Sequence, residues 1–270
     1  LLEMTTLLAI VLGTALGSFM FAAWKQQLWI TGVCLTAVAL VGALASLGIP
    51  RVPPSGATKS LRLNPFGEVW SGARRIYSDK TLRLTVFGIS YFWFLGTLLQ
   101  MDIFLIGKEI LKLAEFENGL LVTFLAVGIG LGSLIAGRLS GDKVELGLVP
   151  LGSIGMGLFS FLLFSSTHSY LRTGVALSLL GFAAGLFIVP LNALLQQRSG
   201  HAEKGQLIAT NNFVNTAGIL LASGVLPLCI NVLRIPPDSI AALFGFLTLA
   251  ATFYSLRVLP DFLIRFSLWM

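Results

Sequence analysis

Neutral amide side chains are the polar groups in the apolar stretches of this sequence that are best suited to bind a ligand. Asn211 and Asn215 are four residues apart, so they share one face if their segment is helical. Amides donate and accept hydrogen bonds without a fixed charge, which suits a phosphodiester or a glycerol group. The alternative is that they hydrogen-bond one helix to another. The candidates are Gln100, Asn192, Gln196, Asn211, Asn212 and Asn215.

Aromatic side chains form a second candidate group, in the run Tyr91-Phe92-Trp93-Phe94. Tyr91 and Trp93 are predicted to offer an apolar wall to an acyl chain. Consecutive helical residues point in all directions, so packed or lipid-facing positions are the alternative.

Ionisable groups are scarce inside the apolar stretches. Asp102 and Glu3 lie near the ends of their segments, where an interfacial position costs little. Their scarcity argues against a proton relay in these segments. Cys34 and Cys229 sit in apolar runs and are predicted to act as small core residues. We expect no catalytic residue, no cofactor and no metal site.

Membrane-spanning helices must position these side chains. Of the 270 residues, 56% are hydrophobic and 11% are charged, and mean hydropathy is +0.88. This excludes a soluble enzyme, a secreted disulfide domain and a disordered tail. We expect an all-α polytopic membrane protein with about eight transmembrane helices. The segments are approximately 4–23, 28–49, 84–106, 118–137, 147–166, 173–195, 207–231 and 239–257.

Basic residues orient the segments. Thirteen of the 18 Lys and Arg residues fall in the linker 50–83, the loops 138–146 and 196–206, and the tail. The opposite set holds Lys25, Lys108, Lys112, Arg172 and Arg234. The positive-inside rule therefore places the larger set, and both chain ends, in the cytoplasm. The same rule accounts for the net charge of +6, so no nucleic-acid partner is expected.

The linker 50–83 is predicted to contain a short amphipathic helix at the membrane surface. Asn64-Pro65 has the pattern of a helix N-cap followed by Pro in the first turn. The apolar residues that follow at helical spacing are Phe66, Val69, Trp70, Ala73, Ile76 and Tyr77. A plain connecting helix with one solvated face is the alternative.

Glycine pairs four residues apart predict closely packed helices. They are Gly13 with Gly17, Gly128 with Gly132, and Gly181 with Gly185. In the loop 137–147, which reads GRLSGDKVELG, charged groups are expected to bond neighbouring helix ends and to latch one conformation. The predicted latch is Gly137, Arg138, Asp142 and Lys143, and an ordinary positive-inside loop is the alternative.

That loop resembles a signature of the major facilitator superfamily, approximately Gly-x-Leu-small-Asp-Arg-x-Gly-Arg-Lys. Gly137, Leu139, Ser140, Asp142 and Lys143 match. An extra glycine precedes the Asp, and the terminal basic pair is absent, as in the weaker second copy of the signature. The superfamily has twelve spans in two six-helix halves, joined by a cytoplasmic linker.

The resemblance implies a partial major facilitator fold that covers spans five to twelve. Residues 1–49 would be the last two helices of the N-terminal half, and 50–83 the cytoplasmic linker. Residues 84–258 would be the six-helix C-terminal half, and 259–270 the start of a cytoplasmic extension. The chain begins with Leu1 and has no signal-peptide pattern, so we expect it to be part of a longer protein.

Several stretches resemble the bacterial lysophospholipid transporter family. They are 2–6, 92–96, 141–147, 189–193 and 209–213. This implies a multi-pass protein of the bacterial inner membrane. It would bring a lysophosphatidylethanolamine-like lipid to the cytoplasmic face for reacylation, by alternating access.

The tail 259–266 resembles the junction to a 1-acylglycerophosphate-type acyltransferase, which is implied as a fused or separate partner. Such enzymes use a His-x4-Asp motif, which neither His168 nor His201 matches, so this segment is not expected to be an enzyme. Two other functions stay open. They are export of drugs or other small solutes, and a membrane anchor for a fused acyltransferase.

Overall fold

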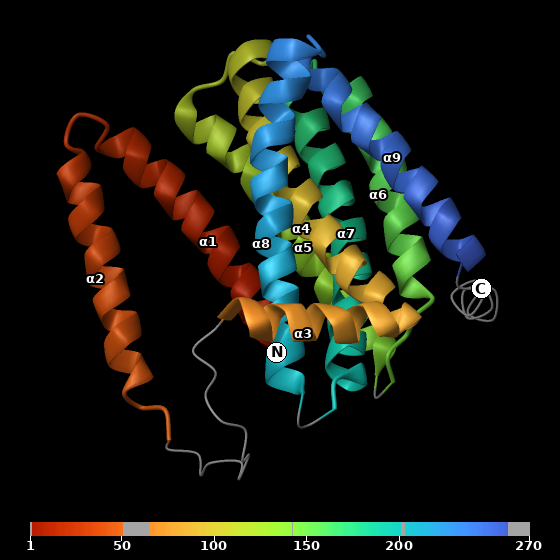
Figure 1. The fold of residues 1–270 in the computed structure, drawn as a ribbon. Coiled ribbons are helices and arrows are strands. Elements are labelled where there is room, and N and C mark those ends of the chain that lie inside the picture. The colour runs from red at the N-terminus through yellow and green to blue at the C-terminus, as the bar shows by residue number, and fades with distance from the viewer. Residues whose placement is uncertain (1, 51–64, 142, 201–202, 259–270) are drawn as a thin grey trace.

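The structure, a computed structural model, describes residues 2–50, 65–141, 143–200 and 203–258. Within these ranges the regular elements are all helical (Figure 1). They are α1 (Leu2–Ala23), α2 (Leu28–Ser46), α3 (Pro65–Ser78), α4 (Lys80–Leu105), η1 (Ile106–Ile110), α5 (Glu115–Ser140), α6 (Leu148–Ser166), α7 (Tyr170–Arg198), α8 (Lys204–Pro227), η2 (Leu228–Val232) and α9 (Pro237–Val258).

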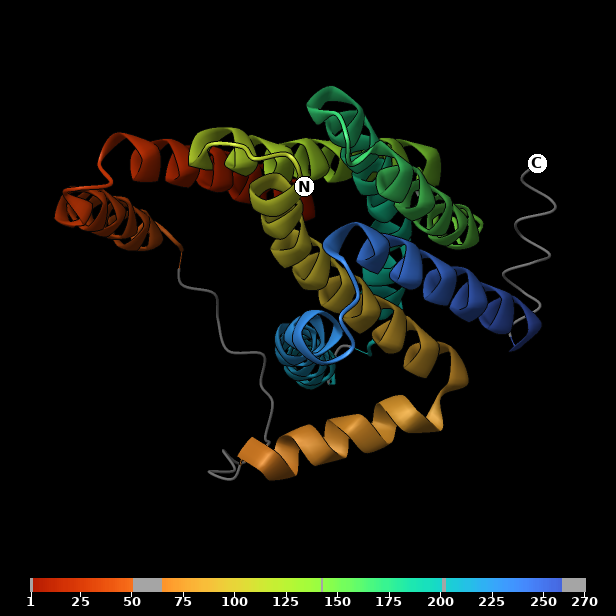
Figure 2. The same ribbon diagram turned by 90° about the horizontal axis from the view of Figure 1, so that it is seen from above.

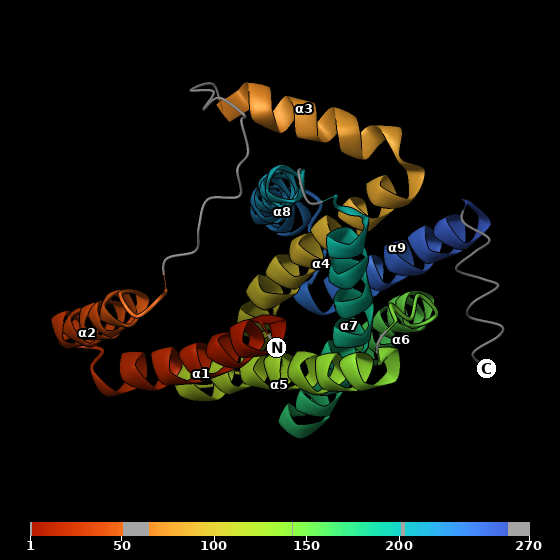
Figure 3. The same cartoon turned by 90° about the horizontal axis from the view of Figure 1, so that it is seen from below.

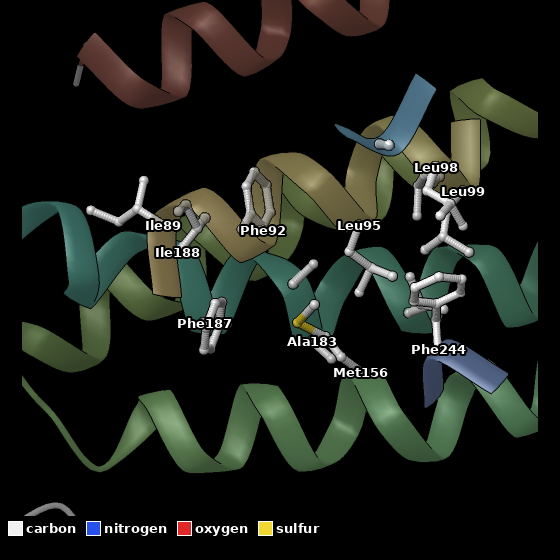
Figure 4. Packing of buried hydrophobic residues seen from close by; sticks show 14 of the residues in the cluster. Ile89, Phe92, Leu95, Leu98, Leu99, Met156, Ala183, Phe187, Ile188 and Phe244 are labelled. Atoms are coloured by element: carbon white, nitrogen blue, oxygen red, sulfur yellow. The ribbon is translucent and has the colours of Figure 1, made fainter. Parts of the chain in front are cut away.

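Helices α4 to α9 form one bundle. Helix α7 packs against α4, α5 and α6, while α8 packs on α4 and α9 packs on α6 (Figures 2 and 3). Most of the buried side chains between them are apolar (Figure 4). Leu95 and Leu98 of α4, Met156 of α6 and Phe187 of α7 belong to this core.

Glycines bring α5 and α7 into direct backbone contact. A Cβ atom on Gly128 or Gly132 would collide with the carbonyl oxygen of Ser178 or Phe182, respectively. A Cβ atom on Gly181 or Gly185 would collide with backbone atoms of α5 in the same way. This close approach is the geometry that drives helix association where no hydrophobic effect operates.

Helix α1 lies against α5, and α2 lies to one side of the bundle (Figure 1). Among the described residues, no other element lies within 4 Å of a Cβ built at Gly13 or Gly17, so the close packing predicted there is not formed within this part of the chain. Helix α1 instead contacts α5 through Ser18, which lies against Gly119, and through Phe19, whose ring meets Phe116 edge-on at 6.3 Å. Helix α2 has no buried residue.

Helix α3 lies at the edge of the bundle, where it crosses α8 near one end and leads into α4 (Figures 1 and 3). Its Ile76 is buried, and Gly72 lies directly against Thr210 of α8. Trp70 and Tyr77 remain 72% and 69% exposed, so part of the predicted apolar face has no protein cover. Asn64, the predicted cap of this helix, lies outside the described residues.

The bundle has the length and composition of a membrane domain. Seven of the described helices are long and apolar enough to cross a membrane, and Leu12–Ala23 of α1 is a shorter apolar helix. Four segments lie at one end of the bundle (Figure 1): helix α3, the turn between α5 and α6, the last turn of α7 and the first turn of α8. Six of the thirteen basic residues that the positive-inside rule assigned to the cytoplasm lie in or next to these segments, so this end is called the basic end below: Arg74, Arg75, Arg138, Lys143, Arg198 and Lys204.

Candidate functional site

An apolar cavity of about 510 Å³ lies between α4, α6, α7, α8 and α9. It is lined by the first half of α4 and of α6, by the middle of α8, and by the last turns of α9. Because successive spans run in opposite directions, these positions all fall in the half of the bundle nearest α3. The cavity therefore lies mainly in the half of the bundle that contains the basic end.

Two hydrogen bonds at the cavity join α4 to its neighbours. The Ser90 hydroxyl donates to Oδ1 of Asn215 on α8 at 2.8 Å, and this pair is buried. The Tyr91 hydroxyl lies 2.5 Å from Oγ1 of Thr248 on α9. Tyr91 also stacks on Phe94, with ring centroids 6.3 Å apart. The cavity thus lies among three helices whose mutual positions are fixed by polar contacts.

The predicted substrate-path residues differ in their positions relative to the cavity. Tyr91 lines the cavity, and Asn215 is buried and bonded to Ser90, which does line it. Asn211 is also buried, and among the described residues its Oδ1 has no hydrogen-bond partner. The remaining candidates do not line the cavity. Trp93 and Asn192 are half-buried, whereas Gln100, Gln196 and Asn212 are exposed.

The basic end is tied together by polar contacts that link α3 and α4 to α7 and α8. Asp79 caps α4 by accepting from the backbone N–H groups of Thr81 and Leu82, and it lies 3.6 Å from Arg198 of α7. Arg75 of α3 lies 3.3 Å from Glu203, which precedes α8. The Gln206 amide of α8 donates to the Glu68 carbonyl of α3 at 3.0 Å.

The predicted latch loop makes few side-chain contacts. Gly137, Arg138 and Lys143 are exposed, and Asp142 lies outside the described residues. Within the described part of the chain, no hydrogen bond or ion pair engages the Arg138 or Lys143 side chain. Gly141 takes a φ of 51°, which its lack of a Cβ permits, and so reverses the chain after α5.

At the opposite end, Lys25 after α1 forms an exposed ion pair with Glu115 of α5. Asp102, which lies near the end of α4, is fully buried among α4 and its neighbours. Neither of its carboxyl oxygens has a hydrogen-bond partner among the described residues. Its burial could not be predicted, because nearness to a helix end does not say which way a side chain points.

Sequence reasoning missed several residues that the structure brings together here. Ser90 was overlooked because a lone serine in an apolar helix has no pattern. The α9 hydroxyls carried a usable signal, since Thr248, Thr252 and Ser255 repeat at helical spacing on one face. Asp79 also carried one, because an acid just before an apolar run is a typical N-cap.

Comparison with known proteins identifies the family of this chain. Residues 1–223 match the family model described as Major Facilitator Superfamily. The chain is 33% identical over 250 residues to the "Lysophospholipid transporter LplT" of Enterobacter sp. (strain 638), covering 91% of this chain and 61% of that protein. It is 32% identical over 253 residues to the protein of the same name from Klebsiella pneumoniae (strain 342), again covering 91% and 61%.

A third relative, from Yersinia pestis (strain Pestoides F), has the same name and is 30% identical over 233 residues. The match covers 85% of this chain and 56% of that protein. The chain therefore spans about three-fifths of the length of the curated relatives it matches. The family match, the all-helical bundle and the seven membrane-length helices agree. This multi-pass membrane protein belongs to the major facilitator superfamily.

Proposed function

We propose that this protein transports a lysophospholipid, of the lysophosphatidylethanolamine type, to the cytoplasmic face of the bacterial inner membrane for reacylation. One observation carries the proposal: over 85–91% of its length the chain is similar to proteins named lysophospholipid transporters. The apolar cavity beside a basic end supports it, because a lysophospholipid combines a hydrocarbon chain with a phosphate. An acyltransferase, fused or separate, would be the partner that receives the lipid.

The proposed domain organisation follows the superfamily plan. Residues 1–49 correspond to the last two helices of the N-terminal half, and 50–83 to the cytoplasmic linker with α3. Residues 84–258 correspond to the six-helix C-terminal half, and 259–270 to the start of a cytoplasmic extension. The solitary position of α2 fits this plan, since helices of its own half would cover it.

Transport would proceed by rocking of the two halves about a site between them. The ion pairs Arg198–Asp79 and Arg75–Glu203 support this, because they tie α3 and α4 to α7 and α8 and favour motion of α4–α9 as one body. The contact of α1 with α5, which ends at the Lys25–Glu115 pair, would be one interface that opens and closes. The loop with Arg138, Asp142 and Lys143 is proposed as the cytoplasmic latch.

Asn211 is the amide we assign most directly to the substrate path. It is buried, and its unpartnered Oδ1 is an acceptor that suits an ammonium head group, while the same amide could also donate to a phosphate. Asn215 is already bonded to Ser90, so its role would be to hold α8 on α4. Tyr91 would act through its ring, which faces the apolar cavity.

The proposal is tested by uptake of radiolabelled lysophosphatidylethanolamine into spheroplasts that express the protein. We expect Asn211→Ala to reduce uptake about fivefold or more, because a polar contact made during transport is worth roughly 1–3 kcal/mol. Asn231→Ala changes the same residue type at an exposed position in η2 and is expected to leave uptake unchanged.

Three results would contradict these assignments. Wild-type protein that takes up no lysolipid would remove the proposed function. Uptake by Asn211→Ala at the wild-type rate and expression level would remove the amide role alone. Acylation of added lysolipid by a variant that cannot transport would instead support an enzyme whose helices serve as an anchor.

A further inference from the structure

The hydroxyl groups that line the cavity, apart from that of the exposed Tyr254, are hydrogen-bonded within the protein. Thr248 donates to the Phe244 carbonyl at 2.6 Å, so the Tyr91 hydroxyl must be the donor in its 2.5 Å contact with Thr248. The others donate as follows: Thr85 to the Thr81 carbonyl, Ser90 to Asn215 Oδ1, Ser153 to the Pro150 carbonyl, Thr252 to the Thr248 carbonyl and Ser255 to the Ala251 carbonyl.

This hydrogen bonding decides which part of an amphiphile fits the cavity. A phosphate accepts hydrogen bonds and donates none when ionised, so it needs N–H or O–H donors. Apart from Tyr254, which is 64% exposed, none of the lining hydroxyls has a hydrogen left to offer. The remaining wall is carbon, for example Phe94, Met156, Leu191 and Val214. A hydrocarbon chain is therefore the chemically matched occupant.

The size and opening of the cavity also suit a chain. Its volume of about 510 Å³ lies in the range of small-molecule sites, roughly 300–1,000 Å³. Water is a poor filler, because a buried water needs two to four polar partners. Phe87, Leu221 and Tyr254 line the cavity and are also exposed, so it opens on the side of the bundle.

Two arginines are next in sequence to residues that line the same cavity. Leu84 and Leu256 line it, and Arg83 and Arg257 directly adjoin them in the chain. The Arg83 guanidinium lies 4.7 Å from the Tyr77 ring centroid, and that of Arg257 lies 4.4 Å from the Phe253 ring centroid. Neither forms an ion pair with a described residue. A guanidinium stacked on a ring keeps N–H groups at its edge for a phosphate.

We propose that this cavity binds the single acyl chain of a lysophospholipid, with the phosphate at the end marked by Arg83 and Arg257. The inference rests on the proposed function and adds to it an acyl-chain site and the direction in which the lipid lies. The site is formed entirely within α4 and α6–α9.

The test uses a lysophosphatidylethanolamine with a diazirine near the methyl end of its chain. The protein is reconstituted in nanodiscs, irradiated with the probe, digested and mapped by mass spectrometry. We expect the label on peptides that contain 84–94 of α4 and 248–256 of α9. Label confined to peptides without cavity residues would overturn the proposal.

Two alanine pairs provide matched variants. Ala251 and Ala250 are exposed neighbours on α9, but only Ala251 lines the cavity. Ala251→Phe is expected to lower the labelling of cavity peptides roughly tenfold, because the ring occupies the place of chain atoms. Ala250→Phe is expected to leave labelling unchanged. On α8, Ala217→Phe and Ala209→Phe repeat the comparison should the first variant not fold.

Further probes separate lipid classes. A diacyl phosphatidylethanolamine with the same diazirine should label the cavity at least about tenfold less, and equal labelling would overturn the assignment to a single chain. Joint replacement of Arg83 and Arg257 by Gln should weaken labelling by the lysolipid and not by a monoacylglycerol with the same chain. Equal weakening of both probes would overturn the phosphate position.

Uptake measured on the same variants distinguishes this inference from the proposed function. Normal lysolipid uptake by Ala251→Phe, with labelling like that of Ala250→Phe, would remove the acyl-chain site and leave transport intact. Cavity labelling that Ala251→Phe abolishes, in a protein that moves no lysolipid, would support the site and remove the transport function.

Discussion

Gly128→Ala is the sharpest test of how the bundle is held together. A Cβ on Gly128 would lie 2.9 Å from the carbonyl carbon of Ser178 and 3.0 Å from the Phe182 nitrogen, with the Ser178 oxygen nearer still. These are backbone atoms of α7, so no side chain can turn away. Relief of the overlap requires α5 and α7 to separate along a shared interface. Overpacking of this kind costs about 1–3 kcal/mol.

The change has an internal control two residues along the same helix. Gly130 has open space where its Cβ would lie, so Gly130→Ala should stabilise the protein by about 0.5–1 kcal/mol through helix propensity alone. Gly128→Ala gains the same propensity and loses the packing, for a net loss of up to about 2.5 kcal/mol. Detergent-micelle unfolding by SDS, followed by circular dichroism, measures both. Shifts of the same sign and size in the two variants would refute the close-packing argument.

Three further predictions follow from buried or capping groups. Ser90→Ala and Asn215→Ala, combined in a double-mutant cycle of unfolding free energies, should show a coupling of about 0.6 kcal/mol or more, and zero coupling would contradict the bond. Asp102→Leu should raise the melting temperature by a few degrees, because it removes a buried carboxyl that has no hydrogen-bond partner among the described residues. A melting temperature below that of the wild type would mean that the carboxyl is hydrogen-bonded in the protein. Asp79→Ala should lower the free energy of unfolding by about 1–2 kcal/mol, because Asp79 both caps α4 and pairs with Arg198. Arg198→Ala removes only the ion pair and should lower it by less than about 1 kcal/mol. Equal losses for the two variants in thermal melting would disprove the cap.

Much of the architecture was predictable because it depends on local composition. An apolar run of about 20 residues must form a helix in a bilayer, where the backbone has no other hydrogen-bond partner. The predicted spans agree with α1, α2 and α4–α9 to within a few residues at most ends. Pro65 likewise predicted the start of α3, because a fixed φ and a missing N–H suit the first helical turn.

The candidate site was predictable only in part. Tyr91 was selected for its aromatic ring, and the ring does face the cavity. Asn211 and Asn215 were selected together as a face of one helix, and both are buried. Their different hydrogen bonding could not be foreseen, because it depends on Ser90, a residue 125 positions away from Asn215 on another helix.

The glycine pairs show why spacing alone is insufficient. All three pairs have the same four-residue separation, yet only those on α5 and α7 meet a neighbouring backbone. Gly13 and Gly17 face open space, because α1 turns Ser18 and Phe19 toward α5. A small residue permits two helices to pack closely only where a second helix lies against it.

The sequence by itself determined the membrane class, the approximate limits of the helices and the family resemblance, and it predicted the orientation of the helices in the membrane. These properties follow from hydropathy, charge placement and short motifs, each of which is local along the chain. The tertiary structure decided which helices touch, that the hydroxyls of α4, α6 and α9 surround one cavity, and that Asp102 is buried. Those properties depend on the rotation of each helix about its axis, which is set by packing against neighbours distant in sequence.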